Sequence, residues 1–103
     1  MREEILEDLW AIVRSIPYGK AMSYGEVGKC LKYPATGRMV GRWIRQSPPD
    51  IPWWRVVNKR GEFPVGKISP EHAFEQEELL KEEGLKIENG RVSPAALLSS
   101  EDL

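Results

Sequence analysis

The sequence of 103 residues contains one cysteine and one histidine. A single cysteine rules out an internal disulfide, and the two residues together cannot supply the nitrogen and sulfur ligands of a typical zinc site. We therefore expect neither a metal nor a cofactor. No apolar run reaches the ~20 residues of a membrane-spanning helix, and the opening "MREEILEDLW" is too acidic for a signal peptide. The expected setting is the cytoplasm, with nucleoid association if the cell is prokaryotic.

Charge is unevenly distributed along the chain, although the net charge is only -1. Residues 38–67 carry seven basic and two acidic side chains, whereas residues 68–103 carry three basic and nine acidic ones. A basic block inside an acidic protein favours a local site for a polyanion. A solvated basic surface, balanced by acidic neighbours, explains the charges equally well.

Three helices are expected in the first half of the chain. Apolar residues at helical spacing predict the first over residues 2–15. Ser23 followed by Glu26 is typical of a capping box and opens a second, short helix. Thr36 is the expected N-cap of a third helix that runs to about Gln46.

The third helix separates its side chains by type. Arg38, Arg42 and Arg45 form one narrow stripe, and the opposite face is apolar. The apolar residues are Met39, Val40, Trp43 and Ile44. Gly37 and Gly41 lie along one border, where another backbone could approach closely. Two short helices joined by a tight turn, the second carrying exposed arginines, resemble a helix-turn-helix.

The stretch "IPWWRVVNKRGEFPV", residues 51–65, is read as two short strands around the turn "NKRG", a hairpin or wing. In a strand, neighbouring side chains point to opposite faces, so Trp53 and Trp54 cannot both face one core. One of the two indoles is therefore expected to face something other than the interior.

The last third predicts one more helix and a small hairpin. Ser69 and Pro70 open the helix "PEHAFEQEELLKEE", and Gly84 ends it. Its expected inner residues are Phe74, Leu79 and Leu80. "ENGR" predicts a hairpin turn, and the tail over residues 94–103 is expected to be loosely held. The fold class is mainly α with a small β-hairpin, a winged helix-turn-helix in a single domain over residues 1–103 whose core spans about 5–87.

Four motifs narrow the interpretation further: "IPYGKAMSYGEV", "GRMVGRWIRQSP", "IPWWRVVNKRG" and "LLKEEG". In order and spacing they resemble the DNA-binding, C-terminal domain of the O6-alkylguanine-DNA alkyltransferases. That family has Pro-Cys-His-Arg-Val in the third motif, with the cysteine as alkyl acceptor. Trp53 stands at the cysteine position here, so the chain resembles the alkyltransferase-like proteins, the non-enzymatic relatives. The resemblance covers roughly residues 5–87.

This resemblance implies that no residue is catalytic. An indole has no lone pair with which Trp53 could accept an alkyl group, and Trp54 stands at the position of the family's base. Glu83 matches the family's acid and, with nothing left to orient, is expected to be a surface or helix-end carboxylate. Cys30 is expected on the inner face of the second helix as a small apolar residue, and His72 on the surface.

The resemblance also implies residues for binding. Arg38 would enter the base stack in place of a flipped nucleotide, and Tyr24 would contact the neighbouring phosphate. Trp53 would form a flat wall of the lesion pocket, together with Tyr24, Val65 and Gly66. The expected contacts to the DNA backbone are Thr36, Gly37, Gly41, Arg42, Arg45, Lys59 and Arg60. Each has a structural alternative: Tyr24, for instance, could simply pack at the start of its helix.

The implied function is binding of O6-alkylguanine in double-stranded DNA by nucleotide flipping, without alkyl transfer, so that nucleotide excision repair proteins are recruited. The expected state is a monomer without a membrane partner. Two alternatives remain open: residual alkyl transfer to Cys30, and a sequence-specific winged-helix regulator. The regulator would need base-reading residues beside the arginine stripe, which has no asparagine or glutamine.

Overall fold

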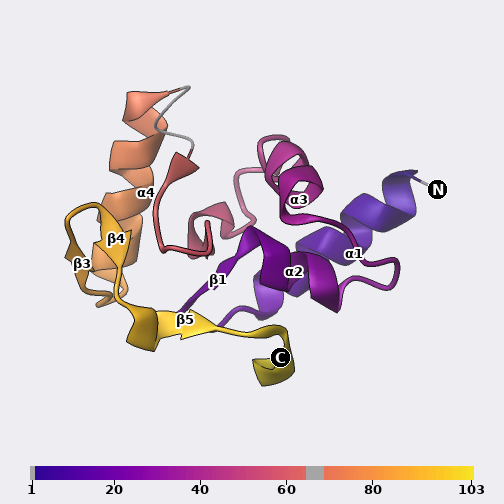
Figure 1. Ribbon diagram of the computed structural model, residues 1–103. Helices are drawn as coiled ribbons and strands as arrows, with labels where there is room; N and C mark the ends of the chain where they lie inside the picture. Colours follow the sequence, from indigo (N-terminus) through magenta and orange to yellow (C-terminus); the bar gives the residue numbers. More distant parts are fainter. Residues whose placement is uncertain (1, 65–68) are drawn as a thin grey trace.

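The computed structural model describes residues 2–64 and 69–103 as four helices and five short strands (Figure 1). The helices are α1 (Arg2–Ser15), α2 (Tyr24–Cys30), α3 (Gly37–Ile44) and α4 (Pro70–Glu82). The strands are β1 (Ala21–Ser23), β2 (Val56–Val57), β3 (Ile87–Glu88), β4 (Arg91–Val92) and β5 (Leu97–Leu98). Helices α1, α2 and α3 gather on one side of β1, and α4 lies with β3 and β4 on the other (Figure 1). In the described part of the chain, no helix is long and apolar enough to cross a membrane.

A three-stranded parallel sheet, in the order β2-β1-β5, lies between these two groups. Alternation along its strands supplies two cores. Met22 and Val56, which pair in register, belong to the core with α1, α2 and α3. Their neighbours Ala21 and Val57 belong to the second core, with Leu80 of α4. The sheet therefore joins the helical part to α4, and the strands β1 and β2 fix the ends of α2 and of the tryptophan segment.

The chain end differs from the expectation of a loosely held tail. Strand β5 pairs with β1, and the backbone N–H of Ser100 donates a 2.9 Å hydrogen bond to the carboxylate of Glu26. This contact also explains why only half of the predicted capping box forms. Ser23 accepts from the backbone N–H of Glu26 as expected, while the Glu26 carboxylate turns to Ser100 and Lys29.

Helices α2 and α3 form the predicted two-helix unit, and Thr36 caps α3 by accepting from the Met39 N–H. The close approach allowed by the glycines is internal to the protein. A Cβ on Gly37 would lie 3.1 Å from the backbone nitrogen of Gly25, and one on Gly41 would contact the Tyr24 ring. The apolar face predicted for α3 is confirmed for Val40 and Ile44, which are buried, whereas Met39 is 46% exposed.

The tryptophan segment is not the first strand of a hairpin. Trp53–Arg55 forms a 3-10 turn closed by the Arg55 N–H on the Pro52 carbonyl, and only Val56–Val57 is extended. Its partner is β1, in parallel, so within the described residues the wing prediction is wrong. The turn "NKRG" does form, since the Gly61 N–H donates to the Asn58 carbonyl. Parallel pairing joins residues far apart in sequence, so alternation in the segment itself could not reveal it.

Helix α4 begins as predicted, with Ser69 as N-cap and Pro70 in the first turn, but it buries a different side chain. Phe74 is 66% exposed, whereas Gln76 is 1% exposed. The Gln76 amide donates to the backbone carbonyls of Trp54 and Val56, at 3.1 and 2.9 Å. These carbonyls would otherwise be buried without a donor, which explains why a polar residue is favoured there over Phe74.

The predicted hairpin at "ENGR" is confirmed. Strands β3 and β4 pair antiparallel, with Ile87 opposite Val92. Asn89 and Gly90 both have positive φ, at 54° and 72°, as a two-residue turn of this handedness requires.

Candidate nucleic-acid interface

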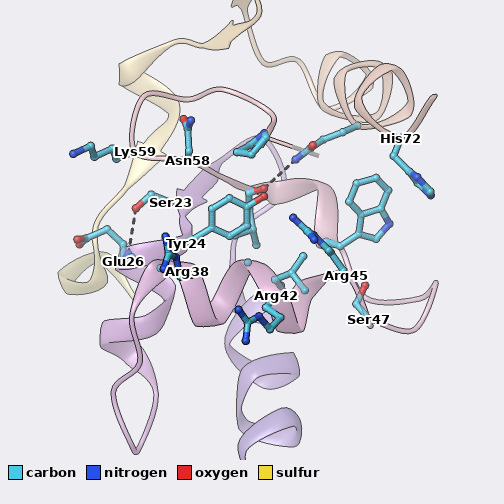
Figure 2. Close-up of a pocket in the computed structure, with 18 of the residues that line it drawn as sticks. Ser23, Tyr24, Glu26, Arg38, Arg42, Arg45, Ser47, Asn58, Lys59 and His72 are labelled. Carbon is cyan, nitrogen blue, oxygen red and sulfur yellow. Dashed lines mark hydrogen bonds between the residues drawn. The ribbon is translucent and has the colours of Figure 1, made fainter. Parts of the chain in front are cut away.

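An open groove of about 1170 Å³ runs between α2, α3, the tryptophan segment and the start of α4 (Figure 2). Its charged lining residues are Glu26, Lys29, Arg38, Arg42, Arg45, Lys59 and Glu75. Ser23, Asn58 and Lys59 lie at one end, His72 lies at the other, and Tyr24 lies between them (Figure 2). Cations outnumber carboxylates in this lining, so the groove favours an anionic ligand.

The three arginines predicted on one stripe of α3 all border this groove and are exposed. Over residues 2–64 and 69–103, none of the three has a carboxylate within ion-pair distance. The contrast is Arg55, whose side chain is 14% exposed and paired with Glu83 at 3.0 Å. Unpaired guanidinium groups on an open surface are available to phosphates, since no carboxylate has to be displaced.

Trp53 is half-buried in the lining of the groove and touches two other rings by their edges. The ring of Trp54 lies 6.0 Å away at 84°, and that of His72 lies 6.2 Å away at 82°. The two tryptophans belong to different cores, since Trp53 packs on the core of α1–α3 and Trp54 on that of α4. The sequence argument that they face apart is therefore confirmed, although the segment is not a strand.

Glu83 is the centre of a buried hydrogen-bond network, and its predicted placement at the surface is wrong. Its side chain is 5% exposed. The carboxylate accepts from Trp54 Nε1 at 2.8 Å, from the Gly19 N–H at 2.8 Å and from Arg55 Nε and Nη2 at 3.0 Å each. Burial acts to raise the pKa of Glu83, but these hydrogen bonds and the charge of Arg55 outweigh it and leave the pKa below its ordinary value.

Tyr24 opens α2 with its ring against Gly41 and borders the groove. Burial raises the pKa of the Tyr24 hydroxyl, and the positive charge of Arg45 opposes part of this rise. The hydroxyl therefore stays protonated at neutral pH. Within the described ranges it has no hydrogen-bond partner, so it is free to donate to a ligand.

Cys30 lies outside the groove lining and is half-buried, with Sγ 3.9 Å from the Ser100 carbonyl oxygen. Burial first, and the negative charge of Glu26 second, raise the pKa of the Cys30 thiol. Both effects lower its reactivity, because the thiolate is the nucleophile. Among the residues that the structure describes, no three histidine, cysteine or acidic side chains gather as a metal site would need.

Most residues predicted for binding lie together. Those that line the groove are Tyr24, Gly37, Arg38, Gly41, Arg42, Arg45, Trp53 and Lys59. Thr36 and Arg60 do not line it, and Thr36 acts as a helix cap. Val65 and Gly66 lie outside the described residues. Sequence reasoning missed His72, which was placed on the surface without a partner; its position three residues after the N-cap Ser69 could have indicated the helix start that faces the groove.

The sequence matches the family described as "6-O-methylguanine DNA methyltransferase, DNA binding domain" over residues 4–85. It is 34% identical over 87 residues to alkyltransferase-like protein 1 of Schizosaccharomyces pombe, covering 82% of this chain and 80% of that protein. It is 30% identical over 94 residues to a DNA base-flipping protein of Vibrio parahaemolyticus, covering 88% and 91%.

The fold matches that of S. pombe Atl1 crystallised with damaged DNA containing O6-carboxymethylguanine, with a TM-score of 0.82 at 30% identity over 94% of this chain and 96% of that one. The Mycobacterium tuberculosis protein OGT matches with a TM-score of 0.62 at 28% identity over 76% of this chain and 47% of the larger protein. The chain therefore belongs to the family of the 6-O-methylguanine DNA methyltransferase DNA-binding domain, as one of its alkyltransferase-like members.

Proposed function

We propose that this protein binds O6-alkylguanine in duplex DNA, flips the nucleotide into the groove, and neither removes the alkyl group nor cuts the strand. One observation carries the proposal: the half-buried Trp53 lines the same groove as the three α3 arginines that lack a carboxylate partner. The relative crystallised with DNA containing O6-carboxymethylguanine supports the choice of lesion.

The groove residues divide the task. Arg38 inserts into the base stack, because a planar guanidinium both stacks and forms hydrogen bonds. The Tyr24 hydroxyl contacts the phosphate of the rotated nucleotide. Arg42 and Arg45 contact further phosphates, and Lys59 and Arg60 beyond the groove end do the same. Trp53 receives the flipped base, where stacking contributes ~1–3 kcal/mol against a cost of a few kcal/mol for unstacking.

Alkyl transfer is not part of this proposal. Trp53 stands where the related transferases carry their acceptor cysteine, and Trp54 stands at the position of their base. The Trp54 nitrogen donates its hydrogen to Glu83 and has no basic lone pair. The alternative acceptor, Cys30, has a raised pKa and lies outside the groove lining.

The output of such a protein is the complex itself. Because the lesion stays in place, a long-lived protein–DNA complex would mark it, and nucleotide excision repair proteins would respond to that mark. The strongly acidic last third of the chain remains free of DNA in this arrangement, since its carboxylates repel phosphate.

Electrophoretic mobility shifts test the proposal directly. Duplexes identical except for one O6-methylguanine are titrated with the protein, and the modified duplex is expected to bind at least tenfold more tightly. Equal affinities would reject lesion recognition. Radiolabelled methyl groups on the substrate DNA must remain on the DNA; label transferred to the protein would reject the non-enzymatic part, and its loss in Cys30→Ser would identify the acceptor.

A further inference from the structure

His72 is a polar aromatic side chain at the rim of the groove for which the binding roles above give no use. It lies in the first turn of α4, exposed, with its ring 6.2 Å from that of Trp53 and nearly perpendicular to it. In Figure 2 it lies at the end of the groove that also holds Arg45 and Ser47, away from Lys59. A base lodged against Trp53 would therefore have the imidazole beside it.

One ring nitrogen of His72 is held and the other is free. Nδ1 lies 2.9 Å from Oγ of Ser69, the N-cap residue, which also accepts from the His72 backbone N–H at 3.4 Å. Ring and backbone are thus tied to the same hydroxyl, which limits the positions that the imidazole can adopt. Over residues 2–64 and 69–103, Nε2 has no hydrogen-bond partner, so it can donate or accept according to the tautomer.

We propose that His72 is a specificity-determining residue that forms a hydrogen bond, through Nε2, with polar O6 substituents of a guanine flipped against Trp53. This inference rests on the proposed function and adds an adduct class to it: alkyl groups that end in oxygen, such as carboxymethyl. Arg45 at the same end attracts a negatively charged substituent, whereas Glu75, which also lines the groove, opposes it. A purely hydrocarbon substituent gains nothing from the imidazole nitrogen.

The test compares two adducts of equal shape, O6-carboxymethylguanine and O6-isobutylguanine, in otherwise identical duplexes, with unmodified guanine as reference. In the wild type the carboxymethyl adduct is expected to bind more tightly. His72→Phe keeps an aromatic ring and removes both nitrogens, so the preference should fall about three- to tenfold, the size of one hydrogen bond, while isobutyl binding stays the same. His72→Gln, which restores a polar group, should recover part of the preference.

Phe74→Ala provides the matched control, since Phe74 lies two residues away on α4, exposed and outside the groove lining. It should leave the preference at the wild-type value. An unchanged preference in His72→Phe would overturn the assignment of His72 while leaving lesion binding intact. If the wild type prefers neither adduct to guanine, the proposed function is rejected, and this inference falls with it.

Discussion

The indole nitrogen of Trp54 donates a 2.8 Å hydrogen bond to Oε2 of Glu83, the same carboxylate that holds the guanidinium of Arg55. Arg55 in turn donates to the Ile16 carbonyl at 2.9 Å, which ties the network to the end of α1. The edge of Trp54 meets Trp53, so this network fixes the wall of the groove from behind. We infer that the two indoles divide the work: one faces the ligand, and the other anchors it to the fold.

Replacing the anchor tests this division. Trp54→Phe keeps an aromatic ring but removes the N–H, so the free energy of unfolding should fall by about 1.5–3 kcal/mol, the range for a hydrogen bond to a charged group. Urea denaturation measures the loss. Trp10→Phe is the matched control, because Trp10 also packs on a core but its nitrogen has no partner in the described part of the chain. Equal losses in the two variants would mean that only ring size matters.

The pKa of Glu83 gives a prediction about acid. Its folded-state pKa lies below the ordinary value of 4.5, so its contribution is present above that pH and is lost as the pH falls through the folded pKa. Glu83→Gln should cost about 3–5 kcal/mol at neutral pH, because Arg55 is left without its carboxylate. The difference from wild type should shrink in acid below that ordinary value, as measured by urea denaturation across a pH series. Glu78→Gln, an exposed change on α4, should cost little at any pH, and a Glu83→Gln deficit independent of pH would contradict the assignment.

Two glycines of α2 provide a paired test of how closely the helices pack. A Cβ on Gly28 would collide with the Ala35 carbonyl, whereas one on Gly25 would meet no atom within 4 Å. Gly28→Ala should therefore destabilise the protein by about 1–3 kcal/mol, while Gly25→Ala should be neutral or stabilise it by up to ~1 kcal/mol through helix propensity. Thermal unfolding of the two variants decides, and a stable Gly28→Ala protein would contradict the packing described for this turn.

Local features of the fold could be predicted from the sequence because short-range chemistry determines them. The caps at Ser23, Thr36 and Ser69 need only a hydroxyl a few residues before an open N–H, and the turn at Asn89 and Gly90 needs only residues that tolerate positive φ. The arginine stripe of α3 follows from helical period alone, and the groove confirms that it faces one side.

Features set by contacts distant in sequence could not be predicted in this way. Glu83 is buried only because donors 28, 29 and 64 residues away converge on it. Gln76 replaces Phe74 in the core because two carbonyls 20 and 22 residues earlier need a donor. Parallel pairing of β1 with β5 likewise joins the two ends of the chain, which no local pattern encodes.

The exposed arginines of α3 should set the salt dependence of DNA binding. Each phosphate contact contributes ~0.9 to the slope of log K against log salt, so Arg42→Ala should lower that slope by about one on modified and unmodified duplexes alike. Fluorescence anisotropy over a salt series measures it. Arg14→Ala is the control, because Arg14 lies on α1 and contacts Asp50 at 3.6 Å rather than lining the groove. A slope unaffected by Arg42→Ala would remove this residue from the interface.

Arg38 should affect lesion binding differently from the other arginines of α3. If its guanidinium fills the space left by the flipped nucleotide, Arg38→Ala should weaken binding to O6-methylguanine DNA by ten- to a hundredfold, roughly the value of base stacking, and binding to unmodified DNA by much less. Because Arg42 lies one turn further along the same stripe, Arg42→Ala serves as the reference for a plain phosphate contact. With 2-aminopurine placed next to the lesion, fluorescence reports unstacking directly. Equal losses on both duplexes, with the fluorescence increase retained, would reduce Arg38 to one more phosphate contact and leave flipping to other residues.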